Sequence, residues 1–166
     1  FARLAERAGI PAGVFNVLPC KNPAGIGHEL CQSPDVRMLS FTGSTQVGKQ
    51  IYAACGDTVK RLALELGGNA PFVVFDDADL ERALAGAVDA RFYNSGQICV
   101  GANRFLVQRG IYREFSQRLA ARVGQLQTGN GFDDTNDIGP MINRAAIERL
   151  TALVESAKSM GAEVLT

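Results

Sequence analysis

The chain has 166 residues, of which 46% are hydrophobic and 20% are charged, and this composition suits a globular protein that buries a core. Its 17 basic residues balance its 17 acidic ones, so there is no overall positive field to concentrate nucleic acid or an anionic membrane surface. No apolar run approaches the roughly 20 residues of a membrane span and no secretory signal pattern opens the sequence, so we expect a cytoplasmic protein that binds neither nucleic acid nor membranes.

The first part of the chain is expected to alternate helices and strands. Residues 1–8 have a helical pattern that stops at Gly9, with no initiator Met and no N-cap, so we expect a fragment that begins inside a helix. The elements expected next are a buried strand at 14–18, a helix at 25–31, a strand at 36–41, a helix at 50–55 and a strand at 59–66. Because parallel strands need crossover connections, this order favours a parallel sheet covered by helices.

The second part continues the alternation. The elements expected are a strand at 72–75, a helix at 80–94, a strand at 104–108, a helix at 112–126 and a helix at 145–160. Asp76, Asp77 and Asp79 precede the helix at 80–94, where aspartates act as N-caps, and a metal site is the less favoured alternative. Residues 161–166 resemble the start of a strand that is cut off, a second sign of a fragment.

A turn of small residues, Thr42-Gly43-Ser44-Thr45, joins the strand at 36–41 to the helix that follows. Such a turn can cradle a phosphate, because glycine lets the backbone approach and the helix N-terminus favours an anion. The Gly-x-Gly-x-x-Gly fingerprint of dinucleotide sites is absent, so an ordinary helix cap at Ser44 is an open alternative.

Glu65 lies near the carboxyl end of the strand at 59–66 and is followed by Gly67-Gly68. Ligands of open α/β sheets collect outside the carboxyl ends of the strands, which makes Glu65 a candidate functional residue. The alternative is an ordinary surface glutamate at a strand end.

The turn Asn94-Ser95-Gly96-Gln97-Ile98-Cys99 delivers a cysteine just before the strand at 104–108. A thiolate in such a turn can act as a nucleophile, and an inert buried thiol is the alternative. The other cysteines, Cys20, Cys31 and Cys55, form no Cys-x-x-Cys pair and are expected to be reduced and structural. His28, the only histidine, is expected to be exposed on a short helix.

Three segments in this order, at residues 41–48, 64–68 and 96–99, resemble motifs of the aldehyde dehydrogenase superfamily. The interval of 34 residues from Glu65 to Cys99 and the later Ile138-Gly139-Pro140 agree with the superfamily pattern. Within the superfamily the chain is most similar to succinate-semialdehyde dehydrogenases, through residues 64–72 and 75–80.

The resemblance implies an α/β fold in two parts. Residues 1–67 would be the later part of a Rossmann-like NAD(P)-binding domain, and residues 68–166 the first part of the catalytic domain. The full-length protein would be a homo-oligomer that oxidises an aldehyde to a carboxylate with NAD or NADP, through a cysteine thiohemiacetal and a thioester. Two alternatives remain open, a catalytically silent folded module and a thiol esterase without redox activity.

The resemblance also assigns roles to individual residues, and no metal is among them. Gly43 and Ser44 would contact the coenzyme pyrophosphate, and Leu66 and Gly67 would lie near the nicotinamide. The nucleophile would be Cys99, with backbone N–H groups of its turn holding the oxyanion. The general base would be Glu65.

Two positions depart from the succinate-semialdehyde dehydrogenase pattern. Tyr93 stands where those enzymes usually have an arginine suited to a bidentate grip on the substrate carboxylate. Arg91 is two residues away and would point elsewhere on a helix. Gly101 replaces a second cysteine that often follows the nucleophile, so an aromatic or aliphatic aldehyde is an alternative substrate.

Overall fold

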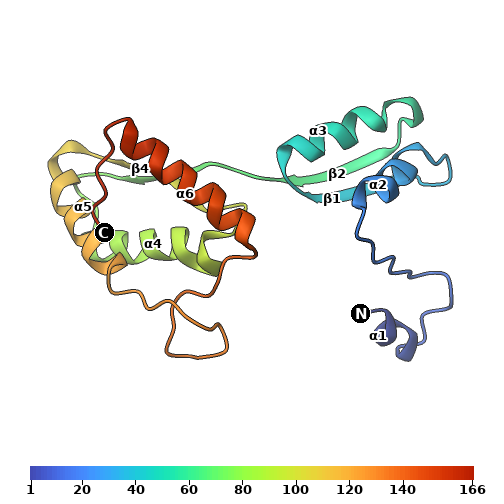
Figure 1. The fold of residues 1–166 in the computed structure, drawn as a ribbon, viewed down its shortest axis with the longest axis horizontal. Helices are drawn as coiled ribbons and strands as arrows, with labels where there is room; N and C mark the ends of the chain where they lie inside the picture. The colour runs from blue at the N-terminus through green and yellow to red at the C-terminus, as the bar shows by residue number, and fades with distance from the viewer. The chain divides into compact units, whose positions relative to one another are not determined.

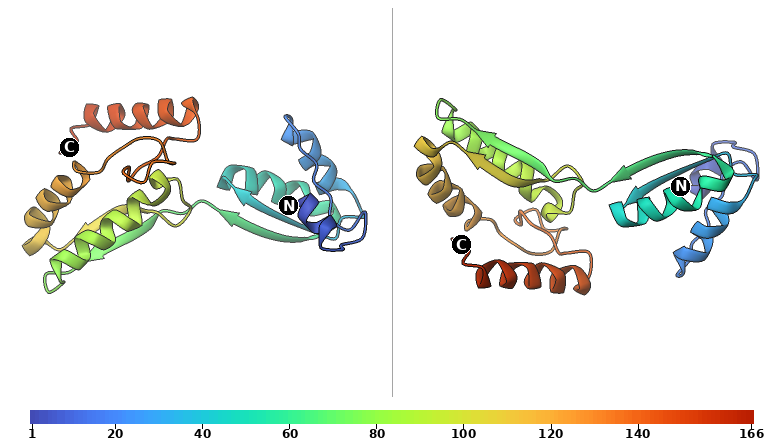
Figure 2. Two further views of the ribbon diagram at one scale, coloured as in Figure 1. Left: turned by 90° about the horizontal axis from the view of Figure 1, so that it is seen from below. Right: turned by 90° about the horizontal axis from the view of Figure 1, so that it is seen from above.

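The computed structural model describes residues 1–166 and divides into two compact units, Phe1–Leu66 (unit 1) and Gly67–Thr166 (unit 2) (Figures 1 and 2). Each unit contains two parallel strands and the helices that pack on them, which confirms the α/β class. That unit 1 belongs to a coenzyme-binding domain and unit 2 to a catalytic domain stays a prediction.

Unit 1 is built around one parallel pair of strands. Its elements are α1 (Ala2–Arg7), α2 (Pro23–Gln32), β1 (Met38–Gly43), α3 (Thr45–Ala54), the 3-10 helix η1 (Gly56–Thr58) and β2 (Arg61–Leu66). The strands pair in register from Met38 beside Arg61 to Gly43 beside Leu66, with α3 as the crossover. This confirms the expected helix and strands after residue 24, and α3 begins earlier than predicted, directly after Ser44.

The core of unit 1 lies between α2, α3 and the strands. Its buried residues are Cys31, Leu39 and Cys55. Gly48 lets α3 approach β2 closely, because a Cβ at this position would lie 2.6 Å from Cδ2 of Leu66. The helix is therefore packed at Gly48 against the side chain of Leu66, the last residue of β2.

The predicted buried strand at 14–18 is wrong. Residues 14–18 are exposed and pair with neither strand of unit 1, and the side chain of Val14 is 70% exposed. The apolar and β-branched residues there satisfy the strand pattern, but a strand forms only where a neighbour accepts its backbone hydrogen bonds. The preceding turn at residues 10–13 is as expected, with the Val14 N–H donating to the Pro11 carbonyl at 3.2 Å.

Unit 2 has the same plan with a longer crossover. Its elements are β3 (Ala70–Val74), α4 (Leu80–Phe92), the 3-10 segment η2 (Tyr93–Gly96), β4 (Ala102–Val107), α5 (Arg109–Val123) and α6 (Arg144–Ser159). Strand β3 runs parallel to β4, and α4 forms the crossover between them. Residues 161–166 adopt no regular structure, so the strand expected there is wrong, since that segment pairs with neither strand.

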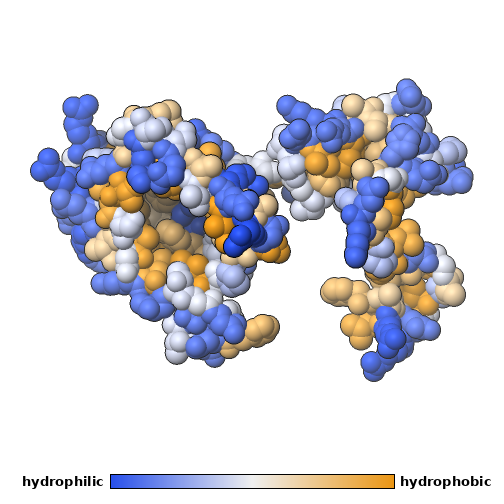
Figure 3. Space-filling view, viewed as in Figure 1, coloured by the Kyte–Doolittle hydropathy of each residue, from blue (hydrophilic) through white to orange (hydrophobic).

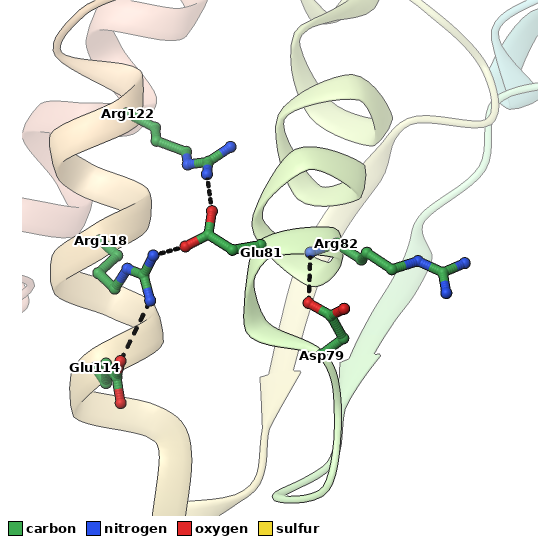
Figure 4. Close-up of polar contacts among 6 residues, drawn as sticks. All are labelled: Asp79, Glu81, Arg82, Glu114, Arg118 and Arg122. Carbon is green, nitrogen blue, oxygen red and sulfur yellow. Dashed lines mark hydrogen bonds and ion pairs between the residues drawn. The ribbon is translucent and has the colours of Figure 1, made fainter.

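The core of unit 2 joins α4 and α5 to the strand pair and consists of Val74, Leu84, Ala87 and Phe115. Asp79 caps α4, as predicted, because its Oδ1 accepts the Arg82 N–H at 3.1 Å (Figure 4). Glu81 on α4 forms ion pairs with Arg118 and Arg122 on α5 (Figure 4). These side chains are 39–57% exposed, so solvent screens the ion pairs and each contributes about 0–1 kcal/mol to stability.

Apolar side chains remain exposed on both units (Figure 3). On α6 they form one stripe, which consists of Ile147, Leu150, Leu153 and Val154. None of the helices has both the length and the apolar character that crossing a bilayer requires. No group of three or more His, Cys, Asp or Glu side chains is arranged to hold a metal ion.

Candidate functional site

Four of the predicted site residues meet at the carboxyl end of the strand pair in unit 1. Gly43 on β1 is the register partner of Leu66 on β2, and Thr42 is the partner of Glu65. Ser44 follows Gly43 directly and precedes the first residue of α3. Parallel pairing therefore brings Gly43, Ser44, Glu65 and Leu66 to one edge, the edge where α/β proteins bind ligands.

Ser44 is the N-cap of α3. Its side-chain Oγ accepts the Val47 N–H at 3.3 Å, which is the ordinary capping contact. Gly43 is confined on one side, because a Cβ there would lie 2.4 Å from Cζ of Phe41. The cap and a phosphate cradle are compatible, since the start of an α-helix leaves further N–H groups without intrahelical partners.

A cavity of about 590 Å³ lies between α2 and α3 in unit 1 and was not foreseen from the sequence. Its wall is mostly apolar and includes Leu18, Pro23, Ile26, Phe41, Val47 and Ile51. Because Phe41 is on β1 and Val47 is in the first turn of α3, the cavity adjoins the Ser44 cap. Little in the sequence indicates this cavity, because the apolar residues of α2 do not show that α3 forms the opposite wall.

Glu65 is exposed on β2 and makes no hydrogen bond or ion pair with the other side chains of the structure. The surface-glutamate alternative therefore describes its burial correctly. An exposed carboxylate can still accept a proton from a bound water, so exposure is compatible with the predicted role of general base.

The cysteine turn of unit 2 has an unusual backbone. Asn94 and Ser95 have φ angles of 50° and 59°, and Gly96 follows at 72°. Three consecutive left-handed residues, two of them not glycine, cost on the order of 1–3 kcal/mol per strained residue and persist only where neighbouring contacts hold them. Strain of this kind concentrates at functional sites.

Hydrogen bonds tie this turn to the loop before α6. The Ser95 hydroxyl donates to the carbonyl of Gly139 at 2.9 Å. The Gln97 side chain accepts the Ile142 N–H through Oε1 at 2.9 Å and donates from Nε2 to the carbonyl of Pro140 at 3.4 Å. The segment 139–142 therefore holds the turn through main-chain hydrogen bonds. Gly139 and Pro140 of the motif Ile138-Gly139-Pro140 supply two of the acceptors.

Cys99 is exposed in a turn that directly precedes β4. The alternative of an inert buried thiol is therefore wrong for Cys99. Cys31 and Cys55 are buried, as structural cysteines are expected to be, whereas Cys20 is exposed. Exposure gives the Cys99 thiol the access that a nucleophile requires.

The Gly67-Gly68 motif is in contact with the cysteine turn inside unit 2. A Cβ on Gly68 would lie 2.8 Å from the carbonyl oxygen of Cys99, so only glycine fits there without movement. The Asn103 side chain donates to the carbonyl of Gly68 at 3.4 Å. The structure thus joins two of the three sequence motifs through main-chain packing, with Gly67 next to the contact.

The cavity beside Cys99 has a volume of about 400 Å³ and is lined by Arg91, Gln97, Cys99, Met141, Ile142 and Arg149. The guanidinium of Arg91 is already engaged, because its Nη1 donates to Oδ1 of Asn103 at 2.9 Å. Tyr93 is 72% exposed. Arg91 therefore lines the cavity with one of its five N–H donors bonded to Asn103 on β4, whereas Tyr93 does not line it.

The chain matches known proteins along its whole length. The aldehyde dehydrogenase family model matches residues 1–166. The succinate-semialdehyde dehydrogenase (NADP(+)) of Escherichia coli is 48% identical over 164 residues, which are 99% of this chain and 34% of that protein. A glutarate-semialdehyde dehydrogenase of Pseudomonas putida is 49% identical over 164 residues, 98% of this chain and 34% of the relative.

Solved structures show the same likeness. The crystal structure of a succinate-semialdehyde dehydrogenase from Burkholderia pseudomallei superimposes with a TM-score of 0.95 at 48% identity, covering 99% of this chain and 34% of that one. The lactaldehyde dehydrogenase of Escherichia coli gives a TM-score of 0.93 at 42% identity, covering 98% and 34%. The chain spans about a third of the length of the relatives it matches.

Proposed function

This chain belongs to the aldehyde dehydrogenase family, and from that premise we propose that the whole protein oxidises an aldehyde to a carboxylate with NAD or NADP. The observation that carries the proposal is the exposed Cys99 on a strained turn packed against Gly68. An accessible thiol on a firmly held backbone suits a nucleophile that must meet a carbonyl carbon in one orientation.

Cys99 would act as its thiolate. Attack of the Cys99 sulfur on the aldehyde carbon forms a thiohemiacetal. Backbone N–H donors of the turn can hold the oxyanion of this intermediate. The hydrogen on that carbon would then leave as hydride, for which a bound nicotinamide would supply the acceptor, and a thioester would remain on Cys99. Glu65 would take a proton from water, and attack of that water on the thioester releases the carboxylate and the free thiol.

The residues of unit 1 fit a dinucleotide. The apolar cavity between α2 and α3 suits a flat heterocycle such as adenine, and the adjoining helix start after Gly43 and Ser44 suits the pyrophosphate. Leu66 and Gly67 would bound the nicotinamide. When bound, the nicotinamide of the coenzyme supplies the hydride acceptor for the reaction.

The names of the relatives favour a short semialdehyde that ends in a carboxylate as substrate, succinate or glutarate semialdehyde. The second candidate substrate is an uncharged aldehyde. It is favoured by Tyr93, which is exposed and carries no charge to bind a substrate carboxylate. Assembly of the whole protein as a homo-oligomer is a proposal that rests on the family likeness alone, and the cytoplasmic location stays an expectation.

The test is turnover by the intact protein. Reduction of NAD and NADP is followed by absorbance with succinate semialdehyde, glutarate semialdehyde, acetaldehyde and benzaldehyde, for the wild type and for Cys99→Ala. We expect coenzyme reduction with at least one aldehyde and its loss in Cys99→Ala. Ester hydrolysis that needs Cys99 but shows no coenzyme reduction with any aldehyde would identify a thiol esterase instead, and no activity in either assay would indicate a silent module.

A further inference from the structure

The backbone of the cysteine turn cannot hold its conformation unaided. Asn94, Ser95 and Gly96 are all left-handed, and a serine in that region of φ and ψ relaxes unless its surroundings oppose relaxation. Cys99 follows only three residues later, so any relaxation of the turn moves the thiol. The contacts that oppose relaxation therefore determine where the sulfur lies.

The side chain of Gln97 makes most of these contacts. Its Nε2 donates to the carbonyl of the strained Asn94 at 3.3 Å and to that of Pro140 at 3.4 Å. Its Oε1 accepts the Ile142 N–H at 2.9 Å, which fixes the orientation of the amide, because a rotated amide would place N–H against N–H. One side chain thus connects the strained turn to the loop at 139–142.

The turn also closes on itself around Gln97. The backbone N–H of Gln97 donates to the Asn94 carbonyl at 3.1 Å, and the Asn94 side chain donates to the Gln97 carbonyl at 3.2 Å. Gln97 is therefore joined to the strained residue through main chain and side chain alike. Ser95 adds a single hydrogen bond to Gly139 and reaches no other part of the turn.

We propose that Gln97 is a positioning residue for the Cys99 nucleophile, acting by clamping the left-handed turn to residues 140–142. The proposal rests on the proposed role of Cys99. Gln97 need not touch the substrate, because its amide groups are already occupied by the protein main chain. Its loss should therefore slow the attack of the thiol and leave coenzyme binding nearly unchanged.

The experiment compares Gln97→Leu with a matched control, Gln108→Leu, in the intact protein. Gln108 also uses its side-chain carbonyl to accept a main-chain N–H, that of Asp76 at 2.9 Å, but it lies outside the cysteine turn. Each variant is assayed for kcat, for KM of coenzyme and aldehyde, for Tm, and for the rate at which iodoacetamide alkylates Cys99. Cys20, which is exposed in unit 1, serves as an internal reference for alkylation, with both sites read by peptide mass spectrometry.

We expect Gln97→Leu to lower kcat and the alkylation rate of Cys99 by tenfold or more, with coenzyme KM within about twofold of wild type. Gln108→Leu should lower Tm and leave both rates unchanged. Gln97→Glu keeps the acceptor for Ile142 but loses the donor to Pro140, so an intermediate loss is expected, and this variant replaces Gln97→Leu if the latter does not fold.

Two results would overturn the clamp. One is a wild-type kcat and alkylation rate in a folded Gln97 variant, and the other is an equal change at Cys20 and Cys99, which would mean general loosening. A different result would contradict the proposed function itself. In that case Cys99→Ala would still oxidise aldehydes, whatever the Gln97 variants do.

Discussion

The α-carbon of Gly68 lies so close to Cys99 that a Cβ on it would come within 2.8 Å of the Cys99 carbonyl oxygen. The obstacle is main chain, which cannot rotate away as a side chain can. Two motifs that are far apart in the sequence thus share one packing contact, and the glycine is required by the cysteine turn.

Gly68→Ala should therefore displace the Cys99 main chain and lower kcat by about tenfold or more, since small misplacements of a nucleophile are costly. The matched control is Gly56→Ala, where a Cβ meets nothing within 4 Å. Steady-state kinetics and Tm for both variants give the answer. Wild-type kcat in a folded Gly68→Ala protein would show that the turn tolerates the shift.

Glu65→Gln should lower steady-state turnover by about 10²- to 10⁴-fold, the usual contribution of a general base. If Glu65 activates water for thioester hydrolysis, rapid mixing should still show a first burst of coenzyme reduction in this variant. Glu6→Gln, an exposed glutamate of α1, is the control. Loss of the burst together with turnover would instead place Glu65 at the deprotonation of Cys99.

Gly48→Ala should have opposite effects on stability in two backgrounds. In the wild type the new Cβ meets Leu66 at 2.6 Å, and overpacking costs about 1–3 kcal/mol against a gain of about 1 kcal/mol in helix propensity. In Leu66→Ala the obstacle is gone, and only the propensity gain remains. Urea unfolding of the four proteins tests the sign change, and a lower stability in both backgrounds would contradict it.

Burial, and after it the neighbouring Cys55 thiol, raises the pKa of Cys31 above its ordinary value. The native state therefore holds this proton more tightly than the unfolded chain, so the stabilisation is complete below the ordinary thiol pKa of about 8.5 and is lost as pH rises through the raised value. Cys31→Val should remove this part of the alkaline loss of stability. Thermal unfolding at pH values from neutral to alkaline measures it, and parallel profiles for variant and wild type would refute it.

Tyr93→Arg should improve the ratio of kcat/KM for succinate semialdehyde over acetaldehyde, because a guanidinium can bind the carboxylate in a bidentate manner. Tyr93 is exposed, so the substitution should leave Tm nearly unchanged. Tyr112→Arg, an exposed tyrosine on α5, controls for added charge. If Tyr93→Arg and Tyr112→Arg change this ratio of kcat/KM equally, then residue 93 does not face the substrate.

Local signals predicted most of the secondary structure. Alternating helices and strands predicted parallel pairing, and Asp79 before an apolar run predicted the start of α4. The segment 14–18 has the composition of a strand, but pairing depends on a neighbour that composition does not reveal. Sequence patterns describe what a segment prefers, and the sheet forms only where two preferences meet in register.

The roles of the candidate site residues stay predictions, and the backbone conformation that holds Cys99 was not predicted from the sequence. The order of three motifs indicated Cys99, Glu65 and Gly43, but nothing local indicated that Asn94 and Ser95 are left-handed. The bonds from Gln97 to residues 140–142 join segments more than forty positions apart, a distance at which single-sequence patterns carry no information. The cavity between α2 and α3 depends on tertiary packing for the same reason.

Each sheet consists of two parallel strands separated along the chain by a single crossover helix, α3 or α4. For a protein made from its N-terminus, this arrangement keeps the loops that must close short, and short loops close quickly. The β1–β2 ladder can form while the ribosome is still translating the codons for unit 2. Cys99 is therefore synthesised after the strands of unit 1, so those strands can pair independently of the cysteine turn.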